Sequence, residues 1–206
     1  MAVYTTIDNP ELHFQAKTYT GNGTAIGSGG QAITLDGDED MQPDWVWIKD
    51  RSDSDRPRMF DVIRGVTKEL DTSDTTGETT LTEGLTTFGS DGFTVGNHEG
   101  VNSNTDSFVA WCWKAGGSGS SNTDGSINTI KTSANTTSGF SINTFTGTQQ
   151  VGTIGHGLGS TPGVLIVKNT AASSDAWYVY HQGLASDPET DYIILNTTAA
   201  KVDYNT

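Results

Sequence analysis

The sequence predicts an all-β protein of the antiparallel sandwich or barrel type, with few helices. Its apolar runs are short, rich in aromatic and β-branched residues, and separated by turn signals such as Asp36-Gly37 and Asp91-Gly92. Runs of this kind at this spacing are typical of strands joined by tight turns. Charged residues make up only 17% of the chain, while threonine, serine, glycine and asparagine are abundant, and this composition favours strands over helices.

The predicted strands of the first half are five apolar runs: AITL, WVWI, FDVI, FTV and SFVAWCW. The segment MFDVIRGVTKEL fits one helical turn as well as a strand. Side chains alternate between the two faces of a strand, and in SFVAWCW and WVWI both faces are apolar. Both runs are therefore expected to be central strands covered on each side. Core positions are accordingly predicted for their tryptophans: Trp45, Trp47, Trp111 and Trp113.

The segment AGGSGSSNTDGS, from Ala115 to Ser126, contains no large apolar residue and predicts a flexible connector. It divides the chain into two modules. The expected organisation is an N-terminal docking segment (residues 1–13), a first β-sandwich module (14–115), a linker (116–135) and a second, incomplete β module (136–206).

Four motifs recur in the same order on the two sides of this connector. The matched pairs are FQAKTYTG with FSINTFTG, QPDWVWIKD with TPGVLIVKN, MFDVIRG with WYVYHQG, and ELDT with ILNT. The second set stops before any counterpart of SFVAWCWK. We therefore expect a second, partial copy of the module, completed either by a neighbouring chain or, as the favoured alternative, by a continuation of this chain.

The net charge of −14 disfavours binding to nucleic acid or to anionic lipid. The single cysteine, Cys112, excludes an intrachain disulfide. No basic segment followed by a long apolar stretch occurs at the N-terminus, and no apolar run is long enough for a membrane span. The expectation is a protein made in a cytoplasm without a cleaved signal and without membrane insertion.

The motifs PDWVWIKDRS, FDVIRGVTKEL, FGSDGFTVGN and FVAWCWKAGG, in this order, resemble the repeated module of virion and tail-associated structural proteins of marine phages, including cyanophages. The segments GTIGHGLGSTPGVLIVKN, AWYVYH and YIILNTTAA are similar to the same family. The resemblance runs from Tyr4 onward. It implies a lectin-like, concanavalin/SPRY-like jelly roll in a tail fibre, spike or particle decoration, and a homo-oligomer, with a trimer favoured. No catalytic residue is carried over.

The expected function is therefore that of a non-enzymatic virion structural protein, made in the host cytoplasm, that acts in assembly with other virion proteins and in host attachment. The N-terminal segment has apolar residues but no hairpin signal, so it is expected to dock on a neighbouring subunit or another virion protein. Its docking residues would be Tyr4, Ile7, Leu12 and Phe14.

The first alternative is a carbohydrate-binding adhesin, because open aromatic rings stack on sugars and anchor interfaces. The candidate partner or glycan residues are Trp177, provided that one of its ring faces is open, with Tyr178 and Tyr180 beside it. The second alternative is a polysaccharide-degrading glycosidase, which needs two facing carboxylates. The Glu189-Thr190-Asp191 stretch is the only E-x-D pattern, and no second Glu follows it closely.

No cofactor is expected. Carboxylates on a turn could hold calcium, and Asp36, Asp38 and Asp40 are the weak candidates. A solvated acidic turn is the favoured interpretation, because the further ligands and the closing Glu of an EF-hand loop are absent. The four histidines show no metal-ligand spacing.

Overall fold

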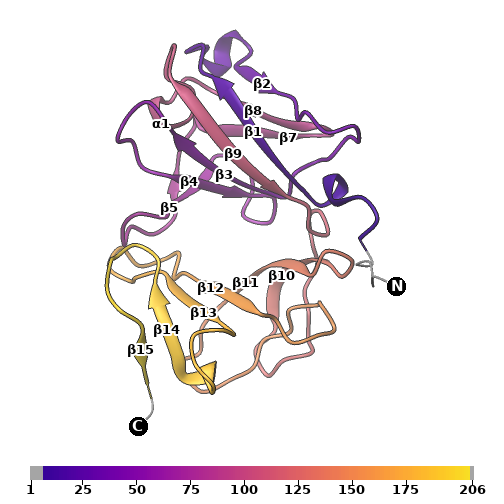
Figure 1. Ribbon diagram of the computed structural model, residues 1–206, viewed down its shortest axis with the longest axis vertical. Helices are drawn as coiled ribbons and strands as arrows, with labels where there is room; N and C mark the ends of the chain where they lie inside the picture. Colours follow the sequence, from indigo (N-terminus) through magenta and orange to yellow (C-terminus); the bar gives the residue numbers. More distant parts are fainter. Residues whose placement is uncertain (1–6, 205–206) are drawn as a thin grey trace.

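A computed structural model describes residues 7–204, and it is built almost entirely of antiparallel β-sheets (Figure 1). The prediction of an all-β sandwich is confirmed. The first unit ends with β9. Its six-stranded sheet has the order β1 (Phe14–Thr20), β9 (Ser107–Trp113), β3 (Trp45–Asp50), β4 (Arg58–Asp61), β5 (Lys68–Asp71) and β6 (Thr79–Thr80). A three-stranded sheet has the order β2 (Gln31–Ile33), β8 (Gly92–Val95) and β7 (Leu85–Gly89).

Helical structure within residues 7–204 is limited to short turns. They are α1 (Glu99–Asn102) and the 3-10 turns η1 (Pro10–Leu12), η2 (Ile26–Ser28) and η3 (Pro188–Thr190). None of these helices is long and apolar enough to cross a membrane. The segment MFDVIRGVTKEL, which fitted a helical turn or a strand, contains most of β4 and of β5 with a turn between them.

The two sheets of the first unit share one hydrophobic core. Phe108 and Cys112 of β9 and Ile48 of β3 are fully buried in a cluster with Phe93 of β8 and Leu85 of β7. This is the face that alternation assigns to the first, third and fifth apolar residues of SFVAWCW. The predicted burial of one face of β9, formed by Phe108, Ala110 and Cys112, is thus confirmed.

The outer face of the six-stranded sheet carries the tryptophans of β3 and β9. Trp45 is 9% exposed and packs with Met59 and Leu70. The other three, Trp47, Trp111 and Trp113, are only partly buried. The core assignment is therefore right for Trp45 and too strong for its three neighbours, because the described part of the second unit covers this face only in part.

The segment expected to be a flexible linker, residues 116–135, is structured. It contains β10 (Thr129–Asn135), which pairs with β11 (Phe140–Phe145). Its start is fixed by Asp44, whose fully buried carboxylate accepts hydrogen bonds from the backbone N–H groups of Ala115 (2.9 Å) and Gly117 (3.0 Å). The predicted linker is therefore too long at its C-terminal end, where residues 129–135 form a strand that composition did not reveal. Residues 116–128 contain no strand, only isolated bridges at Ser120 and Ile127.

The second unit begins with the β10–β11 pair and adds a four-stranded sheet in the order β12 (Val164–Val167), β13 (Tyr178–His181), β14 (Asp191–Ile194) and β15 (Val202–Asp203). All its pairings are antiparallel, as they are in β3-β4-β5-β6. Within residues 7–204, however, no strand pairs with β12 on the side that corresponds to the β9 side of β3.

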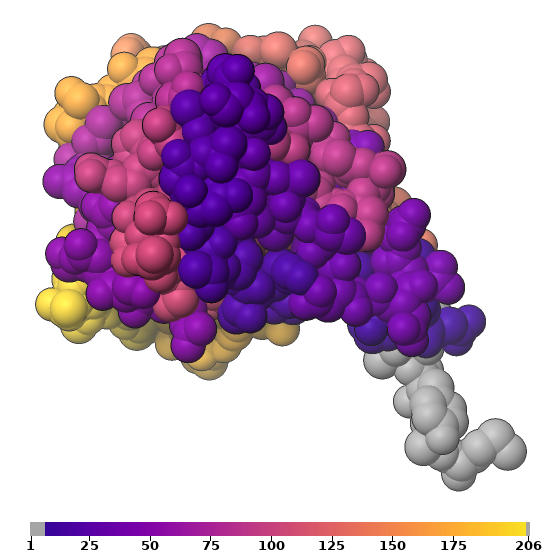
Figure 2. All heavy atoms as spheres, turned by 90° about the horizontal axis from the view of Figure 1, so that it is seen from above, coloured from indigo at the N-terminus to yellow at the C-terminus, as the bar shows by residue number. Residues whose placement is uncertain are grey.

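The second unit lies against the tryptophan face of the first (Figure 1). Seen from above in Figure 2, the first unit covers most of the molecule and the orange and yellow second unit emerges at the rim. Trp177 and Val179 are the buried hydrophobic residues that the described part of the second unit contributes. Trp177 belongs to a cluster with residues of the first unit, so the second unit obtains much of its core from the first.

Candidate functional site

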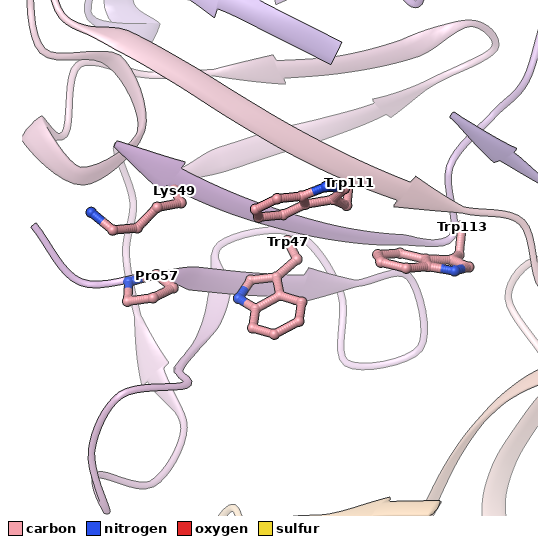
Figure 3. Close-up of a pocket in the computed structure, with 5 residues that line it drawn as sticks. All are labelled: Trp47, Lys49, Pro57, Trp111 and Trp113. Atoms are coloured by element: carbon pink, nitrogen blue, oxygen red, sulfur yellow. The ribbon is translucent and has the colours of Figure 1, made fainter. Parts of the chain in front are cut away.

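An open groove lies on the outer face of the six-stranded sheet. It has a volume of about 400 Å³ and is lined by Trp47 and Lys49 of β3, Trp111 and Trp113 of β9, and Pro57 before β4. Strands β3 and β9 are hydrogen-bonded neighbours, and Trp47 lies directly opposite Trp111 in the ladder. Figure 3 shows the three indoles together, with Pro57 and Lys49 toward one end. Strand alternation and register therefore build this aromatic surface.

Neighbouring rings hold the indoles in place. The centroids of Trp47 and Trp111 are 5.9 Å apart, and the centroid of Trp113 is 4.4 Å from that of Trp45. Phe14, at the start of β1, packs on Trp113 at 4.8 Å. Tilted aromatic pairs at such distances are favourable and restrict ring motion. The rings of the groove are thus largely preorganised.

A second, more polar hollow of about 360 Å³ adjoins the first and shares Trp47 and Pro57 with it. Its remaining lining comes from both units: Thr72, Ser73, Leu195, Asn196, Thr197 and Thr198. The indole N–H of Trp47 donates to the Thr72 hydroxyl at 3.1 Å, which fixes this ring at the junction. Together the two hollows offer apolar ring faces at one end and hydroxyl and amide groups at the other.

The groove is lined by one charged side chain, that of Lys49. The ammonium group of Lys49 donates to the backbone carbonyls of Asp50 (2.5 Å) and Asp53 (3.1 Å). None of the residues that line the two hollows is acidic, although the chain carries a net charge of −14. Such a site suits an uncharged ligand with both apolar and hydroxylated surfaces.

The structure separates the aromatic residues that the sequence grouped as glycan candidates. Trp177 is 2% exposed, and its indole N–H donates to the Asp71 carbonyl at 3.0 Å. The open ring face required for glycan contact is therefore not present, because the first unit covers it. Tyr178 is 44% exposed and Tyr180 is partly exposed. Alternation along β13 places both tyrosines on the face opposite Trp177.

Two further candidate groups also lie apart from the groove. In the acidic turn, Asp36 pairs with Lys17. Among residues 7–204, no group of three or more His, Cys, Asp or Glu side chains is placed to hold a metal, so Asp36, Asp38 and Asp40 do not form such a group. Glu189 is exposed in η3, whereas Asp191 is buried and pairs with Lys201 at 2.6 Å.

The predicted N-terminal docking residues are partly described. Tyr4 lies outside residues 7–204, and Ile7 is partly exposed. Leu12 and Phe14 are 43% and 39% exposed. Phe14 also contacts Trp113, which lines the groove.

Sequence reasoning did not identify Trp47, Trp111 and Trp113 as site residues, because two apolar faces were taken to mean two covered faces. The available signal was the number of large rings on one face of two adjacent strands. Three indoles and the indole of Trp45 need a wide cover, and the second unit supplies only part of it.

Comparison with known proteins gives a family and no function. No curated protein and no solved structure matches the chain. A family model described as "Domain of unknown function (DUF7483)" matches residues 9–206, which is nearly the whole chain. The chain therefore belongs to the DUF7483 family.

Proposed function

We propose that the chain is a non-catalytic, saccharide-binding module of a phage virion surface protein, and that the tryptophan groove holds the saccharide. The observation that carries this proposal is the set of three partly exposed indoles, Trp47, Trp111 and Trp113, on two adjacent strands. Sugar rings offer apolar C–H faces, and flat aromatic side chains bury such faces at little cost in side-chain entropy.

The polar hollow beside Trp47 supports an extended rather than a single-sugar ligand. The hydroxyls of Thr72, Ser73 and Thr197 and the amide of Asn196 can exchange hydrogen bonds with sugar hydroxyls. A chain of sugars would stack on the indoles and reach these groups at the other end. No acidic side chain lines the two hollows, and the ammonium of Lys49 is bonded to backbone carbonyls, so the lining favours a neutral saccharide.

Binding can be measured on a glycan array and then by calorimetry with the best array ligand. We expect Trp111→Ala and Trp113→Ala each to weaken binding by roughly tenfold or more, as truncation of an aromatic anchor commonly does. Tyr178→Ala is the matched control, since Tyr178 is an exposed aromatic residue outside the groove. Its affinity should equal that of the unmodified chain.

Two outcomes would contradict the proposal. One is the absence of binding to any neutral saccharide. The other is binding that Tyr178→Ala removes and Trp111→Ala leaves intact, which would move the site to the second unit.

The virion setting is supported by the resemblance of the tryptophan-bearing motifs to phage structural modules. Host-surface glycans are ligands that a particle meets during attachment, so a saccharide groove fits this setting. Antibodies raised against the chain should label assembled particles in electron micrographs at their tail or surface projections. Labelling confined to the host cell lysate, with bare particles, would refute the virion assignment.

A further inference from the structure

Strand β12 presents an apolar edge that the described part of the chain leaves open. Its four residues, Val164, Leu165, Ile166 and Val167, are 50%, 44%, 43% and 47% exposed. Because side chains alternate along a strand, this exposure involves both faces. Its partner β13 occupies one edge, and within residues 7–204 no strand pairs with the other. Open apolar edges of this kind readily pair with another strand.

Three other edge strands are protected in ordinary ways. Strand β1 carries Lys17, while β6 and β15 have only two residues each. Short strands and edge lysines are common devices against unwanted pairing. In β12 no residue is charged. The nearest lysine, Lys168, is tied back by hydrogen bonds to the carbonyls of Thr75 (2.9 Å) and Asp175 (2.7 Å).

The first unit shows what occupies the corresponding edge there. Strand β3, whose QPDWVWIKD motif matches TPGVLIVKN at β12, pairs with β4 on one side and with β9 on the other. The β9 ladder runs antiparallel from Trp45 opposite Trp113 to Asp50 opposite Phe108. Val46 and Ile48 of β3 are 0% exposed, in the core that β3 and β9 share with the facing three-stranded sheet. The open edge of β12 thus corresponds to the edge of β3 that pairs with β9.

Strand β11 supports the same correspondence from the other side of the missing strand. In the first unit β9 lies between β3 and β1. The FQAKTYTG motif of β1 matches FSINTFTG, which forms β11. Strand β11 pairs with β10, and within residues 7–204 its other edge is free of strands. One added strand could therefore bond to both β11 and β12, as β9 bonds to both β1 and β3.

We infer that the free edge of β12 is a docking site for one extended strand that residues 7–204 do not contain. That strand runs antiparallel to β12 and is apolar on both faces, as β9 is. Main-chain hydrogen bonds supply the affinity in such strand addition, and side-chain pockets supply the selectivity. The inference concerns a surface separate from the tryptophan groove, so it stands or falls independently of the saccharide proposal.

The test uses a synthetic peptide with the sequence of residues 105–114, with serine in place of Cys112 and added terminal lysines for solubility. The full chain should bind it saturably, and hydrogen exchange at the β12 amides should slow by at least tenfold in its presence. The control peptide carries Ala110→Pro, which removes a backbone donor from the middle of the strand. It should bind at least tenfold more weakly.

Matched variants of the chain locate the binding. Leu165→Lys and Ile166→Lys place a charge on either face of the edge, and their exposure makes both substitutions compatible with folding. Each should weaken peptide binding by at least tenfold. Val151→Lys should not, because Val151 is fully exposed outside any strand.

Several results would overturn the inference. They are no binding of the β9 peptide, equal binding of the Ala110→Pro peptide, or equal binding by the two lysine variants. Self-association of the chain that Leu165→Lys abolishes would also overturn it, because a second copy of β12 would then be the occupant.

Discussion

At the scale of single residues, Cys112 shows how burial sets chemistry. It is fully buried in β9, and this burial raises the pKa of its thiol to about 12. The unfolded chain ionises the thiol near its ordinary pKa of 9, whereas the folded chain keeps it protonated. The folded state therefore binds more protons above pH 9, and the free energy of unfolding falls as the pH rises from there toward 12.

We expect this fall to approach about 4 kcal/mol at pH 12, at 1.36 kcal/mol for each pKa unit. Urea unfolding between pH 8 and pH 10 measures its onset. In Cys112→Ala the curve should be flatter between pH 9 and pH 10. Tyr19, whose ordinary pKa of 10.0 is also raised by burial, contributes less in this range and equally in both proteins. An identical slope in the two proteins would contradict the assignment to Cys112.

Tryptophan takes two roles here, and position alone separates them. Trp45 and Trp177 are buried and belong to the same hydrophobic cluster. Trp111 and Trp113 keep open surface although they follow the same alternation. The sequence could place the rings of β3 and β9 on one face, but it could not show how far another unit would cover them. The open ring face on which the glycan prediction for Trp177 depended is not present, since this residue is 2% exposed.

At the scale of elements, the short apolar runs predicted the strands well. WVWI, SFVAWCW and FTV became β3, β9 and β8, and the Ser90-Asp91 pair forms the loop of the β7–β8 hairpin. The strands β10 and β15 were not predicted, because TIKTSAN and VD carry little apolar alternation. Partners distant in sequence stabilise them, and a local pattern cannot reveal such partners.

Strand register shows the limit of motif matching. Matching MFDVIRG with WYVYHQG aligns Asp61 with Val179. In the ladders, however, Asp61 lies opposite Trp45, and His181 lies opposite Val164. If Val164 is the counterpart of Trp45, the counterpart of Asp61 is His181, two residues further on. A shift of two preserves which side chains share a face, so face patterns alone do not detect it.

At the scale of the whole molecule, the two units are joined by a shared core rather than by a tether. Trp177 inserts between the units, where it packs with Trp45, Met59 and Leu70 and donates to the Asp71 carbonyl. A backbone contact reinforces the joint, since Glu78 N–H donates to the Thr170 carbonyl at 2.8 Å. Gly77 fits there because a Cβ atom would lie 2.6 Å from that same oxygen.

This joint predicts that the second unit depends on the first for its stability. Trp177→Ala removes a buried aromatic side chain and leaves the Asp71 carbonyl without its donor, a change that costs about 3–5 kcal/mol. Because that loss falls on the joint, β11–β14 should open before the first unit does. In native-state hydrogen exchange, their amides should exchange at least tenfold faster in the variant, whereas β9 amides keep their rates.

Tyr178→Ala is the matched control for this experiment, because Tyr178 neighbours Trp177 in sequence but is 44% exposed on the other face of β13. Its exchange pattern should follow that of the unmodified protein. If Trp177→Ala instead accelerated β9 and β11–β14 equally, the two units would form one cooperative body, and the partial core of the second unit would not set its stability.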